Sequence, residues 1–170
     1  MIMKRWNYFG IALGVVVADQ ATKAAVVARF TDDAMVTIIP GLFRLVHVEN
    51  RGIAFGLFSD SSSPLAGTIL LLISMAAIVL IGVLLWQHHP AATGTGIGLA
   101  VILGGASGNL VDRLLRGQVV DFLDFYIASY HWPAFNIADS AICIGAGLLL
   151  LDLISGRQTK LAADVSAENR

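Results

Sequence analysis

Four long apolar segments constrain this chain more than any other feature of its sequence. They cover residues 8–28, 65–86, 96–115 and 135–154, and each is long enough to cross a bilayer as a helix, which takes about 20 residues. The chain has 170 residues, of which 56% are hydrophobic and 14% charged, with a mean hydropathy of +0.76. This apolar content is higher than that of ordinary soluble domains. The sequence therefore predicts a membrane protein that is mainly α, with four transmembrane helices.

The remaining residues leave room for only one domain. We expect residues 1–157 to form a single four-helix membrane domain, and residues 158–170 to form a polar tail that is poorly ordered. The longest connection, at about residues 30–63, joins the first two spans. Within it, residues 35–39 and 42–48 are rich in β-branched and aromatic residues and flank Pro40-Gly41. This pattern predicts a small extramembrane β-sheet between the first two helices.

Charge and cysteine content narrow the possible partners. The net charge is -1 and no basic stripe is present, which argues against nucleic acid as a partner. The single cysteine, Cys143, lies inside the fourth apolar segment, where we expect it to be buried, and it allows no intrachain disulfide.

Lys4 and Arg5 precede the first span as in a signal peptide. However, Asp19 and Lys23 have the spacing of a favourable pair on one helix face, which indicates a retained helix.

Polar residues gather at one membrane boundary. An even number of spans puts both termini on one side, and the polar residues fall on the opposite side: Asp19, Lys23, Asn109, Asp112, Arg113, Asn136 and Asp139. Within the third span, Asn109, Asp112 and Arg113 share one helix face because they are spaced i, i+3 and i+4. The same spacing recurs in the fourth span at Asn136, Asp139 and Ser140. Stripes that point to a common centre predict an active site.

Two aspartates in this layer carry the strongest chemical signal. Asp139 lies at the start of the fourth span, and Asp121 lies in the polar connection before it, within Val119-Val120-Asp121-Phe122. A carboxylate at membrane depth is costly and faces protein or water, so it is a candidate functional group. Two converging carboxylates favour a shared proton and acid–base chemistry.

Other chemistries fit the sequence less well. Gly105-Ala106-Ser107-Gly108 resembles the serine motif of rhomboid-type proteases, but every histidine lies outside the four spans. No His-Glu-x-x-His zinc motif is present, and Asp121 with Asp124 is a weak cation signal. A proton-coupled transporter or channel that uses the carboxylate pair is the alternative function, although the acids gather at one boundary instead of continuing through the membrane.

Five sequence blocks, in order, resemble those of the bacterial lipoprotein signal peptidases (signal peptidase II). The blocks are Asp19-Gln20-Ala21-Thr22-Lys23, Asn50-x-Gly52-x-Ala54-Phe55, Gly108-Asn109-x-x-Asp112-Arg113, Val119-Val120-Asp121-Phe122 and Phe135-Asn136-x-Ala138-Asp139-Ser140. With the four spans, the resemblance extends from the first helix to Arg157. One departure is Ile53, where many members have Ala.

The resemblance implies an intramembrane aspartic endopeptidase that removes signal peptides from diacylglyceryl-modified prolipoproteins and cleaves before the lipidated cysteine. It implies that Asp121 and Asp139 are catalytic and share one proton, and it leaves open which of them is the base. It implies no cofactor and no metal. The residues implied to bind substrate or orient the pair are Asp19, Lys23, Asn50, Gly52, Asn109, Asp112, Arg113, Asn136 and Ser140.

The resemblance also implies a location and further partners. We expect a multi-pass protein of the bacterial inner membrane, with both termini in the cytoplasm and the active site at the outer face. Charge counting does not decide this orientation, because Lys and Arg residues are present on both sides. The implied partners are prolipoprotein substrates, membrane lipids and inhibitors of the globomycin type.

Overall fold

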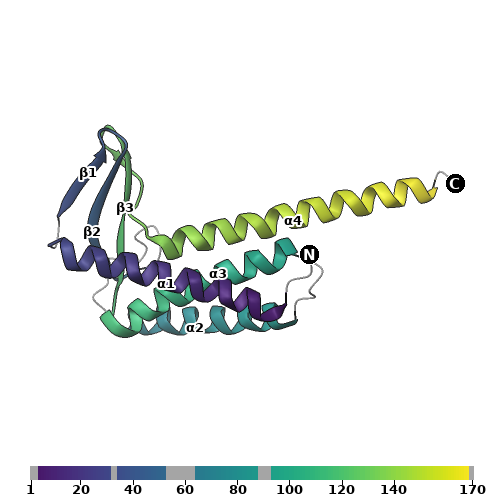
Figure 1. The fold of residues 1–170 in the computed structure, drawn as a ribbon, viewed down its shortest axis with the longest axis horizontal. Coiled ribbons are helices and arrows are strands. Elements are labelled where there is room, and N and C mark those ends of the chain that lie inside the picture. Colours follow the sequence, from purple (N-terminus) through teal and green to yellow (C-terminus); the bar gives the residue numbers. More distant parts are fainter. Residues whose placement is uncertain (1–3, 32–33, 53–63, 88–92, 169–170) are drawn as a thin grey trace.

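Four helices form a bundle, and one small sheet lies at the end of the bundle away from the N-terminus (Figure 1). The computed structural model describes residues 4–31, 34–52, 64–87 and 93–168. The helices are α1 (Arg5–Arg29), α2 (Pro64–Gln87), α3 (Thr93–Arg116) and α4 (Ile137–Glu168). Each contains a stretch that is long and apolar enough to cross a membrane. The predicted four-helix membrane fold is therefore confirmed.

The far end of α4 differs from the expectation. The apolar part of this helix ends at Ser155, but the helix continues to Glu168 and projects beyond the bundle (Figure 1). The tail that we expected to be poorly ordered is therefore helical up to that residue. Its composition gives the reason, since alanine, lysine, glutamine and leucine are good helix formers.

Helix α3 is the centre of the bundle and packs against the other three helices. Its glycines allow close approach on two sides. A Cβ atom at Gly104 would lie 2.6 Å from the backbone oxygen of Ala12 in α1, and one at Gly105 would lie 2.4 Å from that of Ala138 in α4. Glycines at such spacing let helices approach where lipid supplies no hydrophobic drive. The glycines at these two positions therefore allow α3 to approach both α1 and α4 closely.

The sheet has the antiparallel strand order β1-β2-β3-β4, with β1 (Met35–Ile39), β2 (Phe43–Asn50), β3 (Val119–Ile127) and β4 (Tyr130–His131). The predicted sheet is confirmed, and it is larger than expected. Its last two strands come from the connection between α3 and α4, which we had treated only as polar. Val119–Ile127 is itself rich in β-branched and aromatic residues, which explains the extra strand. Part of the predicted extramembrane region, residues 53–63, lies outside the described residues.

Strand β3 joins the sheet to the bundle. Gly117, with φ +73°, follows α3 and donates its N–H to the oxygen of Arg113 at 3.1 Å, which turns the chain into the strand. Val120 and Phe122 pack against Val26 of α1. Because side chains alternate along a strand, Asp121 points to the opposite face. The strands run across the helix axes (Figure 1).

Candidate active site

Asp121 and Asp139 line one cavity of about 470 Å³ at the sheet end of the bundle. Asp121 comes from β3, and Asp139 comes from the first turn of α4. The cavity wall also includes Asn50 from β2 and the α3 residues Asn109 and Arg113. The two aspartates singled out in the sequence therefore face the same space, although they come from different kinds of secondary structure.

Asp121 is buried and is held by two amide side chains. Its Oδ2 accepts a hydrogen bond from Asn50 Nδ2 at 2.9 Å, and its Oδ1 accepts one from Asn136 Nδ2 at 2.7 Å. Burial raises the pKa of the Asp121 carboxyl to about 7, the two amide hydrogen bonds oppose this rise, and the nearby negative charge of Asp139 adds to it. Asp121 is therefore suited to carry a proton near neutral pH.

Asp139 is fixed by the start of its own helix. Its backbone N–H donates to Asn136 Oδ1 at 2.9 Å, and its Oδ2 accepts from the backbone N–H of Asn136 at 3.3 Å. This is the reciprocal arrangement of a capping box. Asp139 Oδ1 accepts a further hydrogen bond from Asn109 Nδ2 at 2.8 Å. The carboxylate lies at the helix N-terminus, where the backbone dipoles favour negative charge.

The hydrogen bonds determine the orientation of each amide. Lys23 Nζ is a donor only and lies 2.9 Å from Asn109 Oδ1, so Asn109 must direct its Nδ2 toward Asp139. Asn136 accepts from the N–H of Asp139 and therefore directs its Nδ2 toward Asp121. Gly52 fixes Asn50 in the same way, by donating its N–H to Asn50 Oδ1 at 2.9 Å. Each aspartate thus faces amide donors in a fixed orientation.

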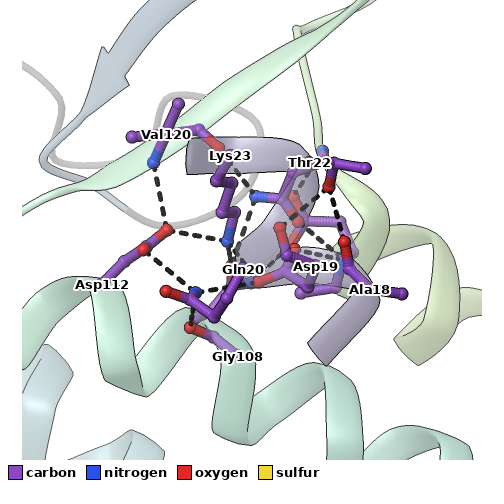
Figure 2. A network of polar contacts seen from close by, with 12 residues as sticks. Ala18, Asp19, Gln20, Thr22, Lys23, Gly108, Asp112 and Val120 are labelled. Carbon is purple, nitrogen blue, oxygen red and sulfur yellow. Dashed lines mark hydrogen bonds and ion pairs between the residues drawn. The ribbon is translucent and has the colours of Figure 1, made fainter. Parts of the chain in front are cut away.

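Behind the cavity lies a buried charge network, shown in Figure 2. Lys23 Nζ lies 2.8 Å from Asp19 Oδ2 and 2.7 Å from Asp112 Oδ2, and all three side chains are fully buried. Gln20 Nε2 lies 3.1–3.2 Å from oxygen atoms of both aspartates and of Gly108. Arg116 pairs with Asp112. Two buried carboxylates require nearby cations, which Lys23 and Arg116 supply, while Gln20 adds neutral hydrogen bonds.

The same network connects the elements that carry the catalytic candidates. Asp19 Oδ1 accepts a hydrogen bond from the N–H of Ala138 at 2.9 Å, at the start of α4. Asp112 Oδ2 lies 3.3 Å from the N–H of Val120 in β3. The buried charges of α1 and α3 therefore hold both the strand that bears Asp121 and the helix that bears Asp139.

The residues predicted for the site divide into two groups. Those that line the cavity are Asp121, Asp139, Asn50, Asn109, Arg113 and Ser140. Those that lie behind the wall and hold it are Asp19, Lys23, Gly52, Asp112 and Asn136. Ser140 Oγ donates to the oxygen of Asn136 at 2.9 Å, so its hydroxyl is tied to its own helix. All of the predicted residues thus come together in one region.

Part of the cavity wall was missed in the sequence. Trp132, Pro133, Ala134 and Phe135 form one side of it. An aromatic residue just before a membrane span is typical of the interface and is the signal that was available for Trp132. Cys143 also lines the cavity and is exposed, which contradicts our expectation that it is buried. It follows Asp139 by four residues and so shares its helix face.

Asp124 does not join Asp121. It pairs with Arg44, whose Nε lies 2.5 Å from Asp124 Oδ2, and with His131 Nδ1 at 3.3 Å. The odd spacing from Asp121 places it on the other face of β3. Within the described ranges, no three His, Cys, Asp or Glu side chains are arranged to hold a metal ion.

Comparison with known proteins identifies the family. The model of the family described as "Signal peptidase (SPase) II" matches residues 11–155. A protein named "Lipoprotein signal peptidase" from Solibacter usitatus is 44% identical over 162 residues, which cover 95% of this chain and 98% of the relative. One of the same name from Geobacter sulfurreducens is 42% identical and covers 88% and 92%.

Solved structures agree with these relatives. Two structures described as bacterial membrane enzymes superpose on this chain with TM-scores of 0.81 and 0.75, at 28% and 29% identity. The first covers 91% of both chains, and the second covers 86% of this chain and 92% of the other. The family model covers most of the chain, including both cavity aspartates and the network behind them. This chain therefore belongs to the signal peptidase II family.

Proposed function

We propose that this protein is an intramembrane aspartic endopeptidase that removes signal peptides from diacylglyceryl-modified prolipoproteins and cleaves before the lipidated cysteine. Membership of the signal peptidase II family supports peptidase activity on prolipoproteins. The observation that carries the aspartic mechanism is the pair of carboxyl groups, Asp121 and Asp139, that line one cavity and are each held by asparagine amides.

We assign different roles to the two carboxyl groups. Asp121, with its raised pKa of about 7, is the proton donor at neutral pH. Asp139 is the base, because it lies at a helix N-terminus and accepts from Asn109, whose oxygen faces Lys23. Two adjacent carboxyl groups share one proton because ionising both is costly.

The proposed reaction then has two steps. Asp139 takes a proton from a water molecule as the water oxygen attacks the scissile carbonyl, and Asp121 donates its proton to the carbonyl oxygen. The resulting tetrahedral diol collapses as Asp121 takes back a hydroxyl proton and Asp139 protonates the departing nitrogen. The C–N bond breaks, leaving a carboxyl group on the signal peptide and a free amine on the lipidated cysteine. No covalent enzyme intermediate forms.

The cavity wall has a part in this scheme. Among the described residues that line the cavity, Arg113 is the cation, and its Nη1 lies 3.5 Å from the backbone carbonyl oxygen of Asn109. We assign it to the substrate carbonyls, because a guanidinium stabilises negative charge that develops on oxygen. The remaining residues behind the wall position the pair.

We further propose that both termini are cytoplasmic, that the cavity opens at the outer face of the bacterial inner membrane, and that globomycin-type inhibitors occupy it. The transporter alternative lacks support from α4, in which the twelve residues between Asp139 and Asp152 contain no ionisable side chain except Cys143. The serine alternative requires a histidine base within reach of the serine in α3. His47 lies in β2 and His131 lies in β4, so neither is carried by a helix of the bundle, and His88 and His89 lie outside the described residues.

The test is cleavage by the purified protein in lipid vesicles. A prolipoprotein that carries the diacylglyceryl group should be cut before its modified cysteine, and the same chain without the lipid should stay intact. Cleavage of both would refute the requirement for lipid, and cleavage of neither would refute the proposed activity. Proton flux across the vesicle membrane without any cleavage would favour the transporter.

A further inference from the structure

An apolar groove lies on the sheet beside the catalytic cavity. It has a volume of about 370 Å³, and its lining includes Leu42, Phe125, Ile127, Tyr130, Trp132 and Phe135. Phe125 and Ile127 are an even number of residues from Asp121 on β3, so the three side chains share one face of the strand. The groove is therefore on the same side of the sheet as the candidate acid.

The groove and the catalytic cavity adjoin. Trp132 and Phe135 line both of them. Phe135 also stacks on Phe125, with ring centroids 6.0 Å apart, and its N–H and carbonyl pair with Leu123 of β3. A ligand in the cavity has a continuous wall along which to extend into the groove.

The two faces of this part of the sheet differ in chemistry. Arg44, Asp124 and His131 form the polar cluster, which alternation along β3 places on the face opposite Asp121. On the groove side, Ile127 and Tyr130 are each 70% exposed, and Phe125 and Leu42 are about 40% exposed. These apolar side chains gather around a hollow beside the catalytic cavity, so they offer a contact surface to an apolar group of a ligand held there.

The lining decides which part of a substrate fits. A peptide segment in the groove would leave N–H and C=O groups without partners, which is costly. A hydrocarbon chain has no such groups. In the substrate proposed above, the acyl chains are the parts without hydrogen-bonding groups, and they are attached to the cysteine next to the scissile bond, within reach of the shared wall.

We propose that this groove binds one acyl chain of the diacylglyceryl group of the substrate. The proposal rests on the proposed function, because it names where part of that substrate lies. It makes Leu42 and Ile127 specificity-determining residues that act through the lipid and not through the peptide bond.

The first experiment compares two substrates that differ only in acyl length, one dipalmitoyl and one dihexanoyl. Leu42→Asn and Ile127→Asn should each raise KM for the dipalmitoyl substrate by about ten-fold, with kcat preserved, since each removes apolar contact from the chain. The dihexanoyl substrate, whose chains are too short to fill the groove, should be cut by the variants as by the parent. Val36→Asn, at an exposed β1 position outside the groove, is the matched control and should change neither.

The outcomes separate this proposal from its foundation. If the parent protein cleaves neither lipidated substrate, the proposed function fails. If the parent cleaves both and the groove variants have no effect on either, or weaken both equally, the acyl-chain site is wrong while the peptidase stands. Equal weakening would mean that the groove contacts bulk membrane lipid.

A second experiment locates the chain directly. A lipopeptide whose palmitoyl chain ends in a diazirine is bound to the Asp139→Asn variant, irradiated and mapped by mass spectrometry. We expect adducts within residues 125–130, and adducts confined to α4 would overturn the proposal. A phospholipid with the same diazirine serves as the second arm. If it labels residues 125–130 and an excess of unlabelled lipopeptide does not displace it, the occupant is bilayer lipid and the proposal fails.

Discussion

The side-chain amides of Asn109 and Asn136 hydrogen-bond to each other, with Asn136 Nδ2 3.2 Å from Asn109 Oδ1. Each also donates to a different cavity aspartate, Asn109 to Asp139 and Asn136 to Asp121. The two carboxyl groups are thus joined through a pair of amides whose far end faces Lys23. A substitution at any member of this hydrogen-bonded series is expected to alter the orientation of both aspartates.

The dyad assignment predicts that Asp121→Asn and Asp139→Asn each abolish cleavage while the protein still inserts and folds. Asparagine has nearly the same shape but cannot relay a proton, so kcat should fall by several orders of magnitude, as for residues that act as a unit. Asp124→Asn is the matched control, because Asp124 lies on the other face of β3 with Arg44. It should keep most of the activity in the same assay. Near-normal turnover by either dyad variant would contradict the assignment.

The raised pKa of Asp121 predicts how activity depends on pH. Above about pH 7 this carboxyl loses its proton beside Asp139 and can no longer act as the acid, so kcat/KM should fall as the pH rises through that value. The measurement is kcat/KM from pH 5 to 9 on one lipopeptide. A profile that is flat across pH 6–8 would disprove the role of Asp121 as proton donor.

The raised pKa of Asp121 also predicts how the stability of the folded protein depends on pH. The folded protein holds the Asp121 proton more tightly than the unfolded chain does, so the parent should lose stability relative to Asp121→Asn between about pH 4 and pH 7. The difference should change by at most about 1.4 kcal/mol per pH unit and level off above pH 7. Thermal unfolding in detergent at several pH values measures it.

Replacement of Lys23 should be strongly destabilising. Lys23→Met leaves Asp19 and Asp112 buried with one cation fewer, which costs about 3–5 kcal/mol when a buried pair loses a partner. Arg29→Met, at the exposed end of the same helix, should change stability by less than about 0.5 kcal/mol. Thermal unfolding of both variants decides the matter, and equal stability of the two would rule out a structural role for the buried charges.

The contact between α3 and α4 predicts a cost for one added methyl group. Gly105→Ala puts a Cβ 2.4 Å from the backbone oxygen of Ala138, so the two helices must separate. Overpacking of this kind costs about 1–3 kcal/mol, and it should lower activity too, since Ala138 directly precedes Asp139. Gly147→Ala, where no atom lies within 4 Å of the added Cβ, should be neutral or slightly stabilising. Comparable unfolding temperatures would argue against close packing at Gly105.

The proposed orientation is tested by thiol labelling. Thr37→Cys lies on exposed β1 at the sheet end, and Gln87→Cys lies at the exposed end of α2 on the opposite side. An impermeant maleimide added to spheroplasts should label the first and reach the second only after the membrane is opened. Native Cys143 must be replaced by alanine beforehand, because it is exposed in the cavity. The reverse labelling pattern would place the cavity in the cytoplasm and contradict the proposed topology.

Much of the fold follows from local pattern. Long apolar runs predicted the four helices, and β-branched clusters around Pro40-Gly41 predicted β1 and β2. Strand β3 carried the same signal, but Asp121 and Asp124 made the segment look like a polar connection. Alternation resolves this, since the two acids point to opposite faces and each finds its own partners.

The site was predictable as a set of residues and not as a geometry. Helical spacing placed Asn109, Asp112 and Arg113 near one face, but it did not separate Asn109, which lines the cavity, from Asp112, which lies behind it. That difference depends on how α3 rotates against α1 and α4, which close contacts at glycines set. The exposure of Cys143 likewise depends on the cavity between β2, β3, α3 and α4, which cannot be predicted from any one of these segments alone.

The order of the cavity residues along the chain has a consequence for biosynthesis. Asn50 precedes α2, Asp121 lies in the connection between α3 and α4, and Asp139 begins α4, so the proposed acid and base are separated by the end of the last connection. A chain that is still being synthesised, with three spans in the membrane, has Asp121 but lacks its partner. The proposed two-aspartate mechanism therefore predicts that proteolytic competence arises only when the final span inserts.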